Sequence, residues 1–441
     1  MVASQTAGPH RLTEMPGGLR VITETMPSVR SVALAFWIGT GSIAESTDEA
    51  GLSHLLEHML FRGTDRFESI AIDQIFDAMG AEINAGTGKD TTSVYTRVLD
   101  RHLERAFAVV ADMVWRPTLG ELEAEREVVL EEIAMYEDDP QDRVFDVLGD
   151  AVFGSHPLGR PVIGRADVVS GATRQQLGAF HHARYVPANV VIAAAGSVDH
   201  DALVAMTRQA LDAGTRPPEG PATVVPAAPP ARMPDVRFLI KDTEQYHVCL
   251  GAPGLARDDE RRFALRVLDN ILGGTSSSRL FQEVRERRGL AYSVFSFTSQ
   301  YAGAGQVGIY VGTRPDNVAA AMEVVGGELE RFVAEPVSEA ELVRSRENVK
   351  GRTVLALEST STRMNRLGSA VLADMPILTV DEVIERIDAV TIDDVAALAA
   401  ELFDPAGLSA AGIGADHDVF QAALGPVSSG LAARAVSGDR S

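Results

Sequence analysis

The sequence predicts an α+β protein made of two homologous domains in tandem, each a mostly antiparallel sheet with helices packed on one face. The chain has 441 residues, of which 45% are hydrophobic and 23% charged, and it is too long for one ordinary domain. A proline-rich segment divides it into two halves of similar length. In each half, strand-like runs in hairpin succession are followed by amphipathic helical stretches, which is typical of this fold class.

The two halves repeat the same order of patterns. Residues 18–42 and 235–254 each contain two strand-like runs. Residues 91–114 and 305–329 each contain a β-rich run, a turn and an amphipathic helix. This repetition favours duplication of one domain over the alternative of two unrelated α+β domains.

Composition shifts give the expected boundaries. Residues 1–214 form the N-terminal domain and residues 235–427 a C-terminal domain of the same fold. Between them, residues 215–234 hold seven of the 21 prolines and no apolar periodicity, which predicts an extended, semi-rigid linker. The tail, residues 428–441, is expected to be disordered.

Charge and cysteine content narrow the class of protein. The net charge of -22 argues against nucleic-acid binding, because contacts to phosphates need clustered Lys and Arg. One cysteine, Cys249, excludes an internal disulfide framework and suits a reducing compartment. The first residues show neither a secretory signal nor a spanning segment, so we expect a cytoplasmic protein without a membrane partner.

The segment GLSHLLEHMLFRGT, residues 51–64, carries the strongest chemical signal. A helix is expected from about Glu49 to Phe61, and in it His54 and His58 lie one turn apart with Glu57 beside them. Imidazoles placed in this way can share one metal ion, most often zinc, and the adjacent carboxylate is then a ligand or a proton acceptor. The pattern is H-x-x-E-H. The alternative is two histidines on a partly buried helix face, which leaves a desolvated glutamate without a partner.

A third protein ligand is required for a catalytic zinc, and an acidic helix offers one. Residues 121–137 carry Glu121, Glu125, Glu131 and Glu132 on a strong helical pattern. Glu125 and Glu132 are separated by two turns and therefore share a face. Taken alone, this segment also fits a solvated acidic stripe.

With these motifs the chain resembles the pitrilysin, or mitochondrial processing peptidase-like, family of zinc peptidases, in its bacterial two-domain form. GTGSIAE before the motif, LFRGT after it, INAGTGKDTTSVY and HPLGRPVIG contribute to the resemblance, which spans residues 18–420. It implies one zinc per chain, held by His54, His58 and Glu132. It also implies that Glu57 is the general base and that Glu125 supports the ligands from behind.

The second half has no H-x-x-E-H, but the family places an Arg and a Tyr seven residues apart there, and Arg285 and Tyr292 fit. The resemblance implies that Arg285 holds substrate and Tyr292 donates to the oxyanion. Basic residues at a helix C-terminus before a capping Gly289 explain the same sequence without a function.

Substrate binding is expected at the INAGT segment, where Asn84 and Ala85 match the backbone-contact positions of the family. A peptide would add there as a strand on a sheet edge. A half-buried strand needs no such function.

The resemblance therefore implies a zinc endopeptidase that acts on unfolded peptides or flexible segments inside an enclosed chamber. Its partners would be peptide substrates and a second copy of the chain, with Arg285 and Tyr292 supplied in trans. Three alternatives stay open: action of the pair in cis, a need for a separate helper subunit, and a non-catalytic or helper subunit of the same fold.

Overall fold

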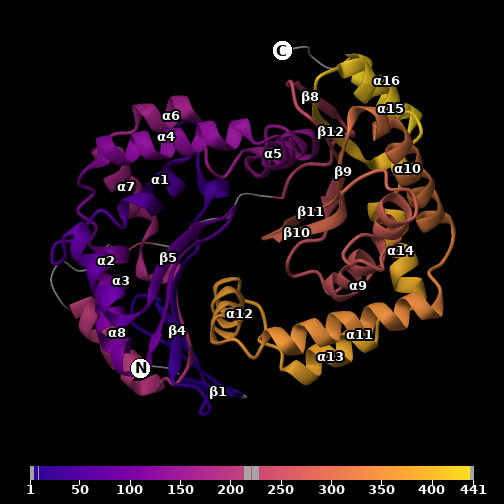
Figure 1. Ribbon diagram of the computed structural model, residues 1–441. Helices are drawn as coiled ribbons and strands as arrows, with labels where there is room; N and C mark the ends of the chain where they lie inside the picture. Colours follow the sequence, from indigo (N-terminus) through magenta and orange to yellow (C-terminus); the bar gives the residue numbers. More distant parts are fainter. Residues whose placement is uncertain (1–3, 8, 213–219, 221–227, 438–441) are drawn as a thin grey trace. The chain divides into compact units, whose positions relative to one another are not determined.

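The computed structural model describes residues 4–7, 9–212, 220 and 228–437, which fall into two compact units (Figure 1). The first unit comprises residues 1–133, 161–226 and 354–379, and the second comprises residues 134–160, 227–353 and 380–441. Among the residues that the structure describes, no helix is long and apolar enough to cross a membrane.

The first unit contains a seven-stranded sheet in the order β1-β2-β3-β7-β4-β6-β5. Only the β3–β7 pair is parallel; the other five pairs are antiparallel. Strand β5, which contains the INAGT segment, forms an edge of this sheet as expected. The strands are β1 Ser4–Ala7, β2 His10–Glu14, β3 Arg20–Thr25, β4 Ser31–Ile38, β5 Glu82–Thr87, β6 Thr92–Leu99 and β7 Val190–Gly196.

One face of this sheet carries the main core of the unit. Alternate residues of β4, such as Leu34 and Phe36, point into a cluster with the helices. The Phe36 ring lies 5.5 Å from Phe107 and 5.4 Å from Trp115, both on α3. The helices of the unit that come from the first half of the chain are α1 Leu52–Met59, α2 Ser69–Met79, α3 Leu103–Trp115, most of α4 Leu122–Asp138, α6 Ala166–Gly171, α7 Arg174–Arg184 and α8 His200–Asp212.

The opposite face is covered by a helix from the second half of the sequence. Helix α12, Thr360–Leu372, packs on β7, β4 and β3 (Figure 1). The sheet offers it small side chains such as Ala35 and Ala193. Buried Glu24, 2% exposed, forms an ion pair with Arg363 of the helix. Because a buried carboxylate needs a partner, this pair fixes where the helix lies.

The second unit contains a five-stranded sheet in the order β10-β11-β9-β12-β8. Again only one pair, β12–β8, is parallel. This order matches β5-β6-β4-β7-β3 of the first unit strand for strand, so the expected tandem of homologous α+β domains is confirmed. The strands are β8 Val236–Ile240, β9 Tyr246–Gly254, β10 Ser293–Tyr301, β11 Ala304–Thr313 and β12 Ser409–Gly414.

This second sheet also receives a helix from the other half of the sequence. Helix α5, Pro140–Phe153, lies against β9, β12 and β8, and its Phe145 ring stacks 5.6 Å from Tyr310. The remaining helices of the unit are α9 Arg262–Leu272, α10 Val318–Ala334, most of α11 Glu339–Ala356, α13 Val380–Asp388, α14 Ile392–Leu402, α15 His417–Leu424 and α16 Ser429–Ser437.

Two expected boundaries differ from the structure. The continuous domains 1–214 and 235–427 are wrong for residues 134–160 and 354–379, which the two units exchange. Helical periodicity shows that a segment has an apolar face, but it does not show which sheet that face will cover.

The expectation of a disordered tail is also wrong over α16. Leu431 and Ala435, one turn apart, are buried there, and α16 packs on α15 and β8. Most of the expected linker, 215–219 and 221–227, and the last residues, 438–441, lie outside the described residues.

The packing of α12 makes a stability prediction. A Cβ atom at Gly368 would lie 2.3 Å from the Trp37 ring, so Gly368→Ala should lower the free energy of unfolding by about 1–3 kcal/mol. Gly351→Ala on α11 is the matched control, because its Cβ would meet nothing within 4 Å, and it should stabilise by about 0.5–1 kcal/mol. Chemical unfolding measures both changes. Equal stability of Gly368→Ala and the wild type would contradict this close packing of α12 on the sheet.

Candidate metal centre and active site

Helix α1 begins at a glycine and is held there by a buried carboxylate. Gly51 adopts a left-handed conformation, with φ 105°. The carboxylate of Glu45 accepts hydrogen bonds from the backbone N–H groups of Gly51 at 2.9 Å and Ser53 at 2.7 Å. These are orphan donors of the first turn, and a negative charge is favoured at that end of a helix. The start and rotation of α1 are therefore fixed.

The rotation of α1 separates an apolar face from a chemical face. Leu52, Leu55, Leu56 and Met59 are buried in the core of the first unit. Positions i, i+3 and i+4 on the other side are His54, Glu57 and His58, as the motif predicts. The helix itself, Leu52–Met59, is shorter than the expected span from Glu49 to Phe61.

Three potential ligand atoms from α1 and α4 meet at one point. The Oε2 atom of Glu132 lies 3.3 Å from Nε2 of His58 and 3.7 Å from Nε2 of His54. All three atoms lie within 4.8 Å of one another. Ligands about 2.1 Å from a tetrahedral zinc ion stand roughly 3.4 Å apart, so this triangle has the size of a zinc site.

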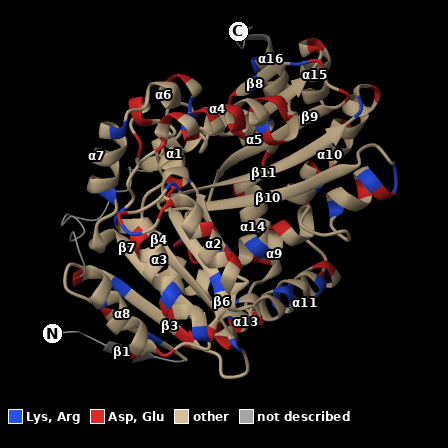
Figure 2. Ribbon diagram, turned by 60° about the vertical axis from the view of Figure 1, so that its left-hand side comes forward, with Lys and Arg blue, Asp and Glu red and all other residues tan. Residues whose placement is uncertain are grey.

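The other acidic residues of α4 behave as the alternative interpretation predicted. Glu123, Glu127 and Glu131 are exposed. Figure 2 shows red acidic positions along α4. Only Glu125 and Glu132 contact the histidines of α1. The helix therefore combines a solvated acidic stripe with two inward carboxylates.

Glu125 lies behind the triangle and orients one imidazole. Its Oε1 atom is 2.8 Å from Nδ1 of His58, and Arg62 pairs with the same carboxylate. With the proton of the ring on Nδ1, the lone pair of Nε2 faces Glu132. A carboxylate on the far nitrogen is the usual support of a metal-bound histidine.

His54 is held in its neutral form. Burial, and then the charge of His58, lower the pKa of His54 to about 4. Its Nδ1 atom is buried and has no hydrogen-bond partner among the described residues. A neutral imidazole keeps its Nε2 lone pair free for a cation at neutral pH.

Glu57 lies beside the triangle rather than in it. Burial raises the pKa of its carboxyl group, while a hydrogen bond from Thr87 lowers it in part. The Thr87 hydroxyl donates to Oε2 of Glu57 at 2.6 Å. This places Glu57 between α1 and the end of the edge strand β5.

The end of β5 is anchored by the glycine-rich segment that follows β4. Backbone N–H groups of Ser42 and Ile43 donate to the carbonyls of Gly88 and Lys89, at 3.1 and 2.7 Å. A Cβ at Gly41 would lie 2.4 Å from the Gly88 carbonyl oxygen, so only glycine permits this approach.

Asn84 and Ala85 lie in the middle of β5. The side chain of Asn84 is exposed, and its Oδ1 accepts the Ala85 N–H at 2.8 Å. The strand pairs only with β6 among the described residues, which leaves its other edge open to an added strand.

Arg285 and Tyr292 belong to the second unit and form a pair there. Arg285 lies in a π-helical turn, Phe281–Glu286, and Gly289 follows it in the left-handed region, φ 61°. The guanidinium of Arg285 sits 4.5 Å over the Tyr292 ring and donates to the Tyr292 carbonyl at 3.0 Å. Tyr292 is 78% exposed, which leaves its hydroxyl free for a ligand.

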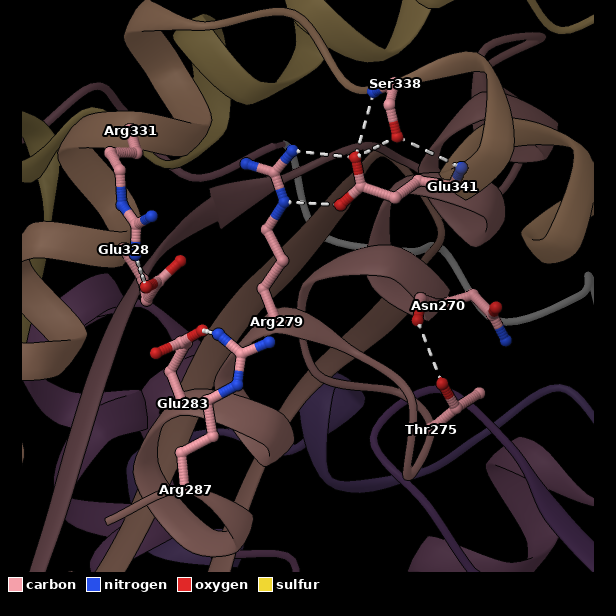
Figure 3. A network of polar contacts seen from close by, with 9 residues as sticks. All are labelled: Asn270, Thr275, Arg279, Glu283, Arg287, Glu328, Arg331, Ser338 and Glu341. Carbon is pink, nitrogen blue, oxygen red and sulfur yellow. Dashed lines mark hydrogen bonds and ion pairs between the residues drawn. The ribbon is translucent and has the colours of Figure 1, made fainter.

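The segment that carries this pair is tied to α11 (Figure 3). Just before the π-helical turn, Arg279 makes two hydrogen bonds to Glu341, at 2.7 and 3.1 Å. Burial opposes ionisation of Glu341, but the bonds from Arg279 and Ser338 dominate and lower its pKa to about 2. Glu283 pairs with Arg287 and Arg288 in the same turn.

Sequence reasoning missed three supporting residues. Glu45 and Thr87 lie within segments that carried the family resemblance, but no local pattern assigned them a contact. Arg62 lies three residues after the end of α1 at Met59, within the LFRGT segment. No local pattern pointed to Glu45 either, because it lies six residues before Gly51, farther away than a capping residue usually does.

The repeated α+β fold and the H-x-x-E-H helix define a class, the zinc peptidases with that inverted motif. The family described as Insulinase (Peptidase family M16) matches residues 20–166, and the one described as Peptidase M16 inactive domain matches residues 171–349. The chain belongs to this pitrilysin-like peptidase family M16.

Curated relatives cover nearly the whole chain. An uncharacterized zinc protease of Streptomyces coelicolor is 43% identical over 90% of this chain and 87% of its own length. One from Mycobacterium tuberculosis is 44% identical over 89% and 90%, and one from Bacillus subtilis is 40% identical over 88% and 94%.

Solved structures share the fold. A protease from Helicobacter pylori aligns with a TM-score of 0.87 and 22% identity, over 92% of this chain and 99% of that one. A peptidase M16 inactive domain from Pseudomonas fluorescens gives 0.85 and 23%, over 94% and 98%.

The neutral state of His54 predicts how the metal-free protein responds to acid. Its folded pKa of about 4 lies below its ordinary value of 6.5, so between these pH values the unfolded chain binds a proton that the native chain does not. The contribution of His54 to the free energy of unfolding is thus fully present above pH 6.5, and it is lost as the pH falls towards 4. Chelator-treated wild type should lose more stability over this window than His54→Gln. The same change at exposed His182 is the control, and an equal loss in wild type and His54→Gln would contradict the assignment.

Proposed function

We propose that the chain is a zinc-dependent endopeptidase that cleaves unfolded peptides or flexible segments. The observation that carries this proposal is the convergence of His54, His58 and Glu132 on one point, with Glu57 beside it. Two imidazoles and a carboxylate suit zinc, and the buried Nδ1 of His54 has no hydrogen-bond partner among the described residues.

The residues of the site divide the chemistry between them. Zinc, when bound by His54, His58 and Glu132, supplies positive charge that polarises a carbonyl group and acidifies water. Glu57 takes the proton of the attacking water at its carboxylate and returns it to the leaving amine. Glu125 holds the ring of His58 in the tautomer that ligation needs.

The open edge of β5 supports a place for the substrate. A peptide added as a strand there would bond to the backbone around Asn84 and Ala85, which gives affinity without strict sequence choice. Thr87, at the end of the same strand, already contacts Glu57. Pairing of the peptide with β5 would thus place the scissile bond within reach of the Glu57 carboxylate.

The preformed Arg285–Tyr292 pair supports a second contribution to the site. We assign Tyr292 to the oxyanion and Arg285 to the substrate, as members of a homodimer in which each chain completes the site of the other. An enclosed chamber built from such a pair would admit unfolded segments and exclude folded proteins.

Metal content and the role of the base are tested together. Wild type should hold about one zinc per chain, and His58→Ala or Glu132→Ala should empty the site, whereas His182→Ala should not. Glu57→Gln should keep its zinc but lose about 10²- to 10⁴-fold in kcat, because an amide cannot accept the proton. Elemental analysis and peptide cleavage measure these outcomes. Near-wild-type zinc in both ligand variants would rule out the ligand set.

The shared site is tested by mixing inactive chains. Glu57→Gln chains and Arg285→Ala/Tyr292→Phe chains should each be nearly inactive alone. After refolding together in equal amounts, half the dimers are mixed, and each mixed dimer holds one intact site of two. Activity should recover to about a quarter of wild type. If mixed dimers form but no activity returns, the pair acts within its own chain.

A non-catalytic helper subunit of the same fold is the alternative. The relative from Pseudomonas fluorescens, described as an inactive domain, makes this class worth testing. Zinc binding without cleavage of any unfolded peptide by the purified chain would favour it.

A further inference from the structure

We infer that the hydroxyl of Thr87 is the group that positions Glu57 for its work, an inference that rests on the proposed peptidase function. Because Thr87 acts through Glu57 rather than on the reacting atoms, it is a positioning residue. Its hydroxyl donates to Oε2 of Glu57 at 2.6 Å, which is a short hydrogen bond.

The strand pattern explains why this threonine reaches α1. Exposure alternates along β5, so Ile83, Ala85 and Thr87 share one face. Ile83 and Ala85 pack on the core that contains α1. The next position on that face brings the Thr87 hydroxyl over the chemical face of the helix, whereas Asn84 points to the other side.

The proton of the Thr87 hydroxyl has one favourable acceptor. Thr92, its partner across the β5–β6 pair, lies 3.4 Å away, compared with 2.6 Å for Glu57. The Thr92 hydroxyl donates its own proton to the Thr40 carbonyl at 3.0 Å. Thr87 therefore has the carboxylate as its near acceptor, and Oε1 of Glu57 is left for the water.

The contact also links two parts of the proposed reaction. Glu57 has single bonds that allow its carboxylate to swing, and without a fixed donor it would sample several rotamers. Thr87 fixes it to the strand on which the peptide is proposed to lie. The same strand would then fix the positions of both the substrate and the Glu57 carboxylate. A small misalignment of the two would lower the rate of the reaction.

Three substitutions separate the hydroxyl from the shape of the side chain. Thr87→Val removes the hydroxyl and keeps the shape, and Thr87→Ser keeps the hydroxyl. Thr96→Val on β6 is the matched control, because its hydroxyl makes an equally short bond, 2.6 Å to the Glu82 carbonyl, but does not contact Glu57. With a short unfolded peptide as substrate, Thr87→Val should lose about 10- to 100-fold in kcat with KM and zinc content little changed. Thr87→Ser and Thr96→Val should stay within about threefold of wild type.

A measurement without zinc or substrate supports the same point. In the metal-free protein, Thr87→Val should lower the melting temperature of wild type but not that of Glu57→Ala, because only the former has a carboxylate to lose its donor. This double-mutant cycle measures the interaction between Thr87 and Glu57 directly.

The outcomes separate this inference from the proposed function. Wild-type kcat in Thr87→Val, or a Thr87→Ser variant as slow as Thr87→Val, overturns the positioning role while peptidase activity stands. If zinc-loaded wild type cleaves no peptide, the proposed function fails, and the metal-free cycle still decides whether Thr87 holds Glu57. Additive melting temperatures in that cycle would overturn the inference.

Discussion

The site depends on one constraint: Nε2 of His54, Nε2 of His58 and Oε2 of Glu132 converge on a common point. Where the lone pairs of such atoms face one another they repel, and the cost is larger where water is excluded. A cation at that point turns the repulsion into binding. The rest of the first unit holds the donors in place. Glu45 sets the start of α1, Glu125 sets the ring of His58, and the core fixes α4 beside them.

The same fold in the second unit lacks the metal-binding motif of the first. Its sheet repeats the strand order of the first, but its sequence contains no H-x-x-E-H, and the family match over residues 171–349 is to a domain described as inactive. The feature that it presents is the Arg285–Tyr292 pair on a π-helical turn. Such turns are rare, and they occur often at functional sites. The two copies therefore share a scaffold but not the H-x-x-E-H motif.

Much of the site was predictable because its information is local. The convergence of His54 and His58 follows directly from their spacing on a helix. Glu125 and Glu132 were predicted because they lie two turns apart on one helix face and match the family motif. The strand-like runs and the repeat were also visible, since period-2 and period-3.6 patterns persist over long runs. The exchanged helices α5 and α12 were not predictable in this way. The sheet that a helix covers depends on where small residues are available, such as Ala193 beneath Gly368 of α12, and these residues lie far from the helix in the sequence. Thr87 was missed for a related reason, because its contact depends on how an edge strand crosses a helix.

The most direct test of the account is anomalous diffraction from crystals of the zinc-loaded protein, with data collected on both sides of the zinc absorption edge. The account predicts one strong anomalous peak per chain, about 2.1 Å from Nε2 of His54, from Nε2 of His58 and from a carboxylate oxygen of Glu132, with Glu57 outside bonding distance. A peak elsewhere, or zinc bound by Glu57 in place of Glu132, would contradict it.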